Sequence, residues 1–360
     1  MQAIREVAKE RGLDPEVLFQ SIEESLVSAY KREFNAKNTD NIRGEVDRDT
    51  GAMFIVVELE VVETVEDPSS QMSLESAKSI SDDFEIGDIL ENRISTEKMG
   101  RLAALAARNA ISQKMNSAEK ERIQSEFMNR IGDIATGIIQ RKDRRDVFVD
   151  IGRAEAILTV NEQMKTDSYD FNRRMKFLIL KVDEKRGRPV IYVSRSHPHL
   201  VKKLFESEVP EIEDGIVEIV AIAREAGSRS KIAVASRDEN VDPVGSCVGQ
   251  KGLRVQAVMD ELRNEKVDIV PWSSDPEVFI SNAMSPAKVI RVDINEDEHT
   301  ARVIVPDHQL SLAIGREGQN VRLAARLTTW KIDIKSEAQF REMIESELMK
   351  IGRASCRERV

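Results

Sequence analysis

The chain has 360 residues, of which 41% are hydrophobic, 33% are charged and 4% are aromatic. That length predicts about two to four domains. No apolar run approaches the roughly 18 to 20 residues that a membrane span requires, and the charged first residues lack the apolar core of a signal peptide. Two cysteines give no disulfide framework. These properties exclude a membrane protein or a disulfide-rich secreted protein and predict a cytoplasmic one.

The net charge of −10 is unevenly distributed along the chain. Residues 1–130 hold 17 Lys and Arg against 26 Asp and Glu, whereas residues 131–196 hold 14 against 10. An acidic segment is poorly suited to phosphate and better suited to a basic protein surface. A basic segment attracts a polyanion. The charge pattern therefore predicts protein docking in the first third and nucleic-acid binding after it.

The acidic segment, residues 1–130, is expected to form an α/β domain. Its first clear helix has Asp14 as a plausible N-cap and Pro15 as a good first residue, with apolar residues following at helical spacing. Alternating β-rich runs around a turn predict a hairpin over residues 42–65. A long helix is expected from Glu97 to about Ile131.

Short strands separated by turn residues begin after Gly132 and predict a five-stranded β-barrel of OB type over residues 131–196. The strands are expected at residues 134–139, 147–151, 154–160, 175–182 and 190–194.

The second expected strand carries the candidate RNA-binding surface of the barrel. Because side chains alternate along a strand, Val147 and Val149 point to one side and Phe148 to the other. An outward Phe beside basic residues is typical of a base-stacking platform with an electrostatic funnel. The basic residues are Arg141, Lys142, Arg144 and Arg145. The alternative is that Phe148 only caps the barrel core and that the basic turn is a solvated hairpin.

Residues 197–275 and 276–350 repeat one order of elements: helix, hairpin, short helix, Gly-x-x-Gly loop, helix and strand. The loops Gly249–Gly252 and Gly315–Gly318 lie 66 residues apart. A single such loop could be a simple corner between helices, but two copies at equivalent points of a repeat favour RNA binding.

The two glycines allow a sharp turn and the close approach of a ligand backbone. The helix that follows presents unpaired N–H groups and a positive dipole end, which suit phosphate, and a KH domain clamps about four nucleotides in this way. The candidate RNA-binding residues are Gly249, Gln250, Lys251, Gly252 and Arg254 in the first loop, and Gly315, Arg316, Glu317, Gly318 and Arg322 in the second. Because the Glu317 carboxylate repels phosphate, we expect the first loop to bind RNA more tightly.

The sequence contains no pattern typical of a catalytic or metal site. His197 and His199 lie in a linker without a partner motif for metal, and neither a phosphate-binding Walker loop nor a nucleophile elbow is present. Cys247 is interpreted as a small core residue. We therefore expect no enzyme activity, no cofactor and no metal.

The order of these segments resembles the NusA family of bacterial transcription elongation and termination factors. The most specific matching stretches are residues 209–212, 221–236, 242–258, 282–286 and 312–324. The resemblance spans residues 1–350 and implies a multidomain α+β protein. Its parts would be an acidic α/β N-terminal domain, the OB-type barrel and two tandem prokaryotic-type (type II) KH domains.

The resemblance also implies a function. The N-terminal domain of such a protein binds core RNA polymerase at the flap of the β subunit, while the barrel and KH domains hold nascent single-stranded RNA. The protein then modulates pausing, intrinsic termination and antitermination, with other antitermination factors as possible partners, and we expect a monomer without membrane contact. Glu317 departs from the family pattern, in which that loop position is more usually uncharged.

Two alternatives remain open at this point. One is the accessory RNA-binding part of a ribonuclease, and the other is a ribosome-associated or translation-associated RNA-binding protein.

The last ten residues, 351–360, break away from the preceding helical pattern and resemble the translation of a common sequencing-adapter oligonucleotide. Our hypothesis is that this segment is not native and that the natural C-terminus is missing, so that Cys247 is the only genuine cysteine. A natural basic tail is the alternative, and resequencing the locus distinguishes the two.

Overall fold

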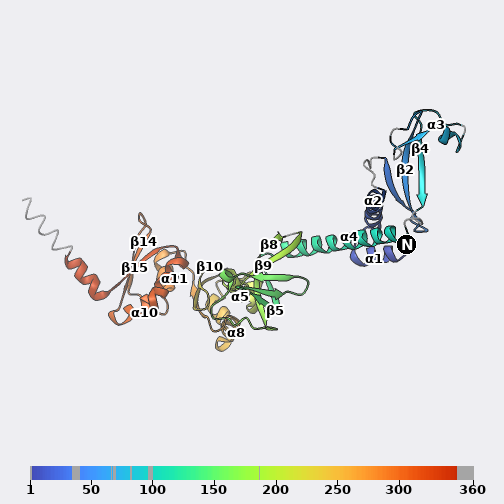
Figure 1. Cartoon of the computed structure of the whole chain (residues 1–360). Helices are drawn as coiled ribbons and strands as arrows, with labels where there is room; N and C mark the ends of the chain where they lie inside the picture. The colour runs from blue at the N-terminus through green and yellow to red at the C-terminus, as the bar shows by residue number, and fades with distance from the viewer. Residues whose placement is uncertain are drawn as a thin grey trace, which may run out of the picture. The chain divides into compact units, whose positions relative to one another are not determined.

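The computed structural model describes residues 2–34, 41–65, 67, 70–81, 83–95, 100–185 and 187–346. The chain divides into two compact units, residues 1–125 and 126–360 (Figure 1). The tail expected to be non-native and the expected start of the long helix at Glu97 lie outside the described residues.

The first unit contains the predicted helix and hairpin. The helix α2 spans Pro15–Phe34, and the Asp14 side chain accepts a hydrogen bond of 3.0 Å from the Glu16 N–H, which confirms the N-cap. The strands β1 (Ile42–Val46) and β2 (Met53–Val62) pair antiparallel, which confirms the hairpin.

The sheet of this unit is larger than the sequence predicted. Strand β4 (Ile89–Ser95) pairs antiparallel with β2, and the short β3 (Gln71–Ser73) pairs with the end of β2. The additional helices are α1 (Gln2–Arg11) and α3 (Leu74–Lys78). The long helix α4 (Gly100–Met128) buries alanines against the sheet, including Ala103 and Ala107.

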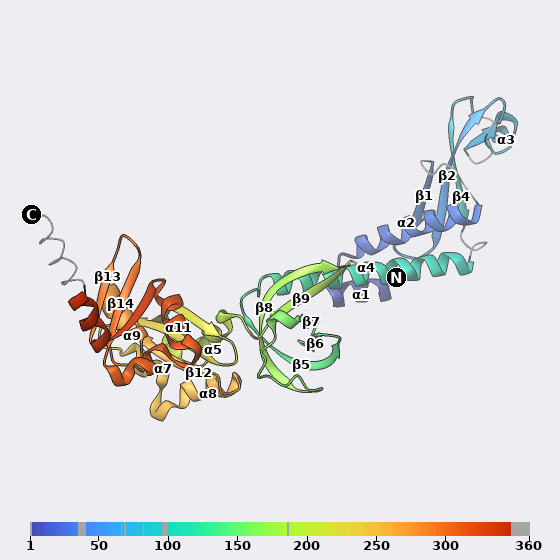
Figure 2. The same ribbon diagram turned by 60° about the vertical axis from the view of Figure 1, so that its left-hand side comes forward.

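The second unit begins with a closed five-stranded barrel in the order β5-β6-β7-β9-β8, which confirms the OB-type prediction (Figure 2). The strands are β5 (Ile134–Asp143), β6 (Asp146–Asp150), β7 (Glu155–Leu158), β8 (Arg174–Lys185) and β9 (Arg188–Ser194). Val147 and Val149 are buried in the barrel while Phe148 is half-buried on its outside, as the alternation predicted. Strand β5 runs on to Asp143, so the basic hairpin turn is tighter than expected.

Two domains of the same topology follow the barrel. Each has a three-stranded sheet in which the first two strands pair antiparallel and the last two pair parallel. The first contains α5 (Pro198–Glu208), α6 (Pro210–Glu213), β10 (Val217–Glu225), β11 (Arg229–Ser236), α7 (Pro243–Val248), α8 (Leu253–Glu261) and β12 (Lys266–Pro271). The second contains α9 (Pro276–Ala283), β13 (Arg291–Asn295), β14 (Thr300–Val305), α10 (Leu310–Ile314), α11 (Gln319–Thr328) and β15 (Lys331–Ser336). This order confirms two tandem type II KH domains.

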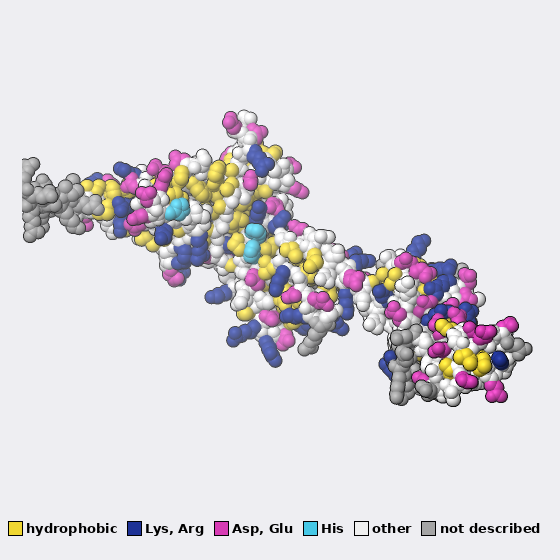
Figure 3. All heavy atoms as spheres, turned by 90° about the horizontal axis from the view of Figure 1, so that it is seen from above, with side chains coloured by type: hydrophobic (Ala, Val, Ile, Leu, Met, Phe, Trp, Pro, Cys, Tyr) yellow, Lys and Arg dark blue, Asp and Glu magenta, His cyan; other side chains and the backbone are white. Residues whose placement is uncertain are grey.

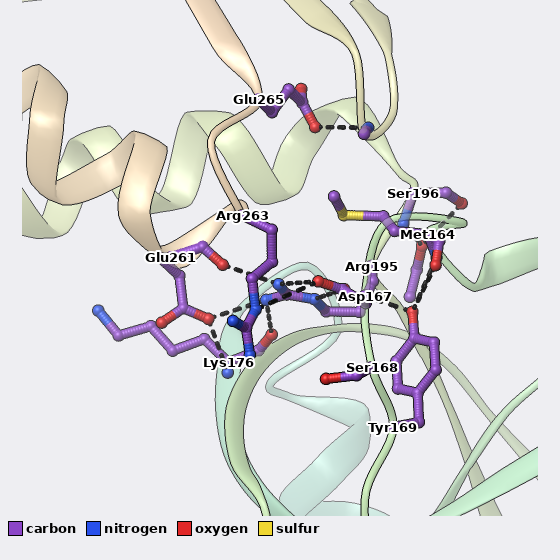
Figure 4. Close-up of polar contacts among 12 residues, drawn as sticks. Met164, Asp167, Ser168, Tyr169, Lys176, Arg195, Ser196, Glu261, Arg263 and Glu265 are labelled. Atoms are coloured by element: carbon purple, nitrogen blue, oxygen red, sulfur yellow. Dashed lines mark hydrogen bonds and ion pairs between the residues drawn. The ribbon is translucent and has the colours of Figure 1, made fainter.

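Buried ion pairs join the barrel to the first KH domain (Figure 4). Arg195, at the end of the barrel, has a fully buried side chain that donates to the buried Asp167 carboxylate at 2.9 Å and to Glu261 of α8 at 2.8 Å. It also donates to the Lys176 carbonyl at 2.7 Å. Burial alone lowers the pKa of Arg195, but the hydrogen bond and charge of Asp167 and the charge of Glu261 outweigh burial and raise it. The guanidinium therefore stays charged inside this junction.

The two KH domains share a hydrophobic core. Ala223 and Ala233 of the first sheet pack in one buried cluster with Leu323 and Leu327 of α11. The buried Lys231 ammonium donates to the Asp268 carboxylate at 3.2 Å and to the Ser285 carbonyl at 2.6 Å, which links the first sheet to the segment after α9. The barrel and both loops are therefore held within one compact unit.

Candidate nucleic-acid interface

The two Gly-x-x-Gly loops have nearly the same backbone conformation. Gly249 and Gly315 lie at φ 73°, ψ 177° and φ 76°, ψ 172°, a region that essentially only glycine adopts. The third loop residues are left-handed although neither is glycine, with φ 52° at Lys251 and φ 53° at Glu317. The repeat seen in the sequence is therefore a repeat of backbone geometry, and it presents Lys251 and Glu317 in the same way.

In each loop, the side chain five residues after the first glycine donates a hydrogen bond back to a carbonyl of the short helix before the loop, and so braces the loop. Arg254 donates to the Ser246 carbonyl at 2.7 Å, and Asn320 donates to the Ala313 carbonyl at 3.1 Å. A Cβ on the first glycine of either loop would approach this bracing side chain to within 3 Å. The close approach explains the glycine and gives Arg254 a role in shaping the loop.

Arg254 is also engaged by a carboxylate. Its Nη1 lies 2.9 Å from Oε2 of Glu211, which sits on the short helix α6. Lys251, in contrast, is exposed and makes no ion pair with any described residue. A groove of about 670 Å³ lies beside this loop. It is lined by Glu211, by the loop residues Gly249 and Gln250, and by Leu253 at the start of α8. Of the two predicted cations, Lys251 is the one available to phosphate.

The helix α11, which follows the second loop, is paired with the first KH domain. Arg322 Nε donates to Oε1 of Glu225 at 2.6 Å, and Gln319 Nε2 donates to Oε2 of Glu225 at 2.7 Å. Arg326 approaches the same carboxylate at 3.8 Å. These contacts, led by the Arg322 hydrogen bond, lower the pKa of Glu225. Arg322 is thus paired with a carboxylate of the first KH domain, although its side chain is 45% exposed.

Arg316 is the cation of the second loop that pairs with no described carboxylate outside the loop, and Glu317 is its neighbour. Their side chains are 92% and 83% exposed, and Arg316 Nε lies 4.0 Å from Glu317 Oε1. A carboxylate this close reduces the attraction of Arg316 for phosphate.

The barrel surface combines an aromatic ring with cations. The Arg141 guanidinium lies 3.9 Å from the centroid of the Phe148 ring and also donates to Glu155 at 3.1 Å. Lys142 lies 5.9 Å from the Tyr169 ring. Arg144 and Arg145 are exposed at the hairpin turn. A base can stack on the outer plane of the Arg141–Phe148 pair, since both groups are flat.

Basic, acidic and apolar side chains are interspersed over the face of the second unit that Figure 3 shows. The predicted site residues fall in three groups within this unit, one on the barrel and one at each loop. Sequence reasoning missed Glu211 and Glu225, the carboxylates that hold Arg254 and Arg322 from 43 and 97 residues away. No local sequence signal connects residues so far apart.

His197 and Cys247 have structural roles. His197 and His199 do not lie in a linker as the sequence indicated, because His197 is the N-cap of α5 and His199 lies in its first turn. The His197 Nδ1 accepts a hydrogen bond of 3.2 Å from the His199 N–H. Cys247 is fully buried, and burial raises the pKa of its thiol to about 12. Within the described ranges, His, Cys, Asp and Glu side chains form no cluster suited to a metal ion. The helices in these ranges include none with the length and hydropathy of a membrane span.

Four family models match successive parts of the chain. They describe a NusA N-terminal domain at residues 1–121, an S1 RNA binding domain at 129–194, a NusA-like first KH domain at 195–272 and a NusA-like second KH domain at 276–342. Among solved structures, the N-terminal domain of NUSA from B. subtilis is 33% identical over 33% of this chain and 94% of that chain, with a TM-score of 0.29.

Whole-length relatives agree with these models. The transcription termination/antitermination protein NusA of Bacillus subtilis is 50% identical over 343 residues, which cover 95% of this chain and 92% of the relative. The proteins of the same name from Thermus thermophilus and Mycobacterium tuberculosis are each 41% identical, over 96% and 94% of this chain and 92% and 93% of those relatives. The chain therefore belongs to the NusA family of transcription termination/antitermination proteins.

Proposed function

We propose that this protein is a transcription elongation factor that binds RNA polymerase and nascent RNA, and that it modulates pausing, intrinsic termination and antitermination. The observation that carries the RNA part is the repeated loop geometry at Gly249–Gly252 and Gly315–Gly318. The loops lie in one compact unit with a barrel whose half-buried Phe148 lies outside the barrel core beside Arg141. A single RNA strand is bound by all three sites. The protein acts by binding and uses no catalytic step.

The polymerase part rests on family membership and on charge. Residues 1–130 have a clear excess of acidic side chains, 26 against 17 basic ones, which suits a basic protein surface. We propose that this domain docks at the β-subunit flap and that the protein does so as a monomer. Tethering to polymerase raises the effective RNA concentration at loops that each grip only about four nucleotides.

The test changes Gln250 and Lys251 to Asp in the full chain and measures RNA affinity and retention on core RNA polymerase. We expect RNA affinity to fall at least about tenfold, because a charge-assisted phosphate contact of about 1.5 kcal/mol or more is lost and repulsion is added. Polymerase retention should be unchanged. The matched control is Arg237→Asp with Asn240→Asp, which alters net charge equally on the same domain outside the loop and should leave RNA affinity near that of the unchanged protein.

Unchanged RNA affinity in the loop variant, with the fold intact, would refute the clamp. If the unchanged protein co-sedimented with ribosomal subunits and failed to retain core polymerase, the transcription role would be wrong.

A further inference from the structure

Phe171, in the loop before β8, is the most exposed large apolar side chain among the described residues. Its side chain is 80% exposed. An exposed Phe is unfavourable in water by the hydrophobic effect unless something covers it. Among the described residues, no cation or second ring packs on the Phe171 ring, whereas the Phe148 ring is covered on one face by Arg141.

The backbone on both sides of Phe171 is fixed. Before it, Tyr169 is buried and its hydroxyl accepts a hydrogen bond of 2.8 Å from the Met164 N–H (Figure 4). After it, the Asn172 N–H donates to the Ile139 carbonyl at 2.8 Å. The loop that carries the ring is thus anchored on both sides. Binding of a ligand to the ring therefore costs little conformational entropy of the loop.

These anchors place the loop beside the barrel face that carries Phe148. Ile139 of β5 is paired across the sheet with Val149 of β6, the neighbour of Phe148. On the other edge of β5, Arg174 pairs with Ile138, and both side chains are exposed. The anchored loop therefore borders the same strand that supplies the Arg141 guanidinium.

The charge around Phe171 matches a polyanion. Arg174 is exposed and makes no ion pair with a described residue, and Lys142 of β5 reaches to 5.9 Å from the Tyr169 ring in the same loop. The carboxylate next to Phe171 in the chain is that of Asp170, and its Oδ2 is paired with Nη1 of Arg173 at 3.9 Å. Aromatic rings alternating with cations are the arrangement that binds single-stranded nucleic acid without strong sequence preference.

We propose that Phe171 is a second base-stacking residue of the barrel, which extends the bound RNA strand beyond Phe148 along β5. The proposal deepens the RNA-binding function above and rests on it. It makes the barrel contact at least two bases, so that the barrel holds a strand in a defined direction relative to the two KH loops.

The test compares single variants of the full chain for binding to unstructured oligo(A) and oligo(U). Phe171→Ala should lower affinity at least about fivefold, with a larger loss on oligo(A), because purines stack more strongly. Phe171→Trp should retain affinity, and Phe171→Leu should lose affinity nearly as Ala does, because Leu keeps apolar area but has no π-face. The matched control is Val160→Ala, which truncates another exposed apolar residue of the barrel domain. Val160 is 47% exposed, and its substitution should change affinity less than twofold.

An affinity of Phe171→Ala within twofold of the unchanged protein would overturn the proposal and leave RNA binding by the chain intact. An unchanged affinity of Phe171→Leu would overturn it as well, since the aromatic face would then be unnecessary. If Phe171→Ala bound RNA normally but lost retention on core polymerase, the ring would be a protein contact and the proposal would be wrong. Absence of RNA binding in the unchanged protein would instead refute the proposed function.

Discussion

At the scale of single residues, the charges around the two loops are already partly satisfied inside the protein. Arg254 is held by Glu211, and Arg322 is held by Glu225 together with Gln319. Positive charge near a Gly-x-x-Gly loop therefore does not measure the charge available to RNA. Among the described residues, no carboxylate outside the loops pairs with Lys251 or Arg316, and only Arg316 has a carboxylate beside it in its own loop. This difference is the physical basis for expecting the first loop to bind RNA more tightly.

Glu225 offers a direct test of this neutralisation. Glu225→Gln removes the carboxylate that holds Arg322 and Arg326. RNA affinity should rise about two- to fivefold. A partly exposed ion pair is worth roughly 0.5 to 1 kcal/mol, and RNA phosphate no longer has to break this pair to reach Arg322. The measurement is an RNA titration, with Glu218→Gln, which removes the partner of the exposed Arg237, as control. A loss of affinity would mean that Glu225 positions the loop and does not compete with RNA.

The same residue makes stability depend on pH. Because Arg322 and the other partners lower the pKa of Glu225 below its ordinary 4.5, the contact stabilises the folded chain fully above that pH. The stabilisation is lost as pH falls through the lowered pKa. Between pH 6 and pH 3 the Tm of the unchanged protein should therefore fall more than that of Glu225→Gln. Parallel Tm curves for the two proteins would contradict this assignment.

At the scale of elements, the barrel and α8 are joined by charges that are taken out of water. Arg195 and Asp167 have fully buried side chains, and Glu261 and the Lys176 carbonyl complete the arrangement. A buried pair adds little net stability compared with apolar packing, but breaking it leaves an uncompensated charge. The junction therefore favours one relative placement of these elements.

Arg195→Met should destabilise the second unit by about 3 to 5 kcal/mol, because the buried Asp167 carboxylate loses its partner. Denaturant unfolding of the full chain, followed by a probe of the barrel, measures the change. Arg237→Met, which removes an exposed pair with Glu218, should cost about 1 kcal/mol or less. Equal effects of the two substitutions would show that the junction is not held by this pair.

At the scale of the whole molecule, the strands and helices that position the three proposed RNA sites belong to one compact unit, and the acidic first segment belongs to the other. A strand that contacts all three sites displaces several counterions, so its affinity must fall steeply with salt. Each phosphate contact to single-stranded RNA contributes about 0.7 to the slope of log affinity against log salt.

Lys251→Ala should make the fall of log affinity with log salt less steep by about 0.7, because one phosphate contact is lost. Arg316→Ala should have a smaller effect, since Glu317 lies 4.0 Å away. Lys331→Ala, an exposed cation on β15, is the control of equal charge and should leave the slope unchanged. RNA titrations at four or five salt concentrations give the slopes, and equal changes for all three variants would indicate a diffuse charge effect without a defined loop contact.

Much of the fold could be predicted from local patterns. The α2 N-cap, the hairpin, all five barrel strands and the order of both KH domains follow from periodicity and turn residues that act over a few positions. The helices α1 and α3 and the strands β3 and β4 were missed. The two strands are formed by pairing with β2, and sheet formation depends on such packing more than on local preference.

The sequence by itself determined where the two loops lie and why they need glycine, since a backbone conformation is a local demand on one residue. Only the tertiary structure decided which cations are available at those loops. Glu211 and Glu225 reach Arg254 and Arg322 across 43 and 97 residues because packing brings distant elements together. Pairing of this kind depends on distances in space, and no spacing along the chain encodes it.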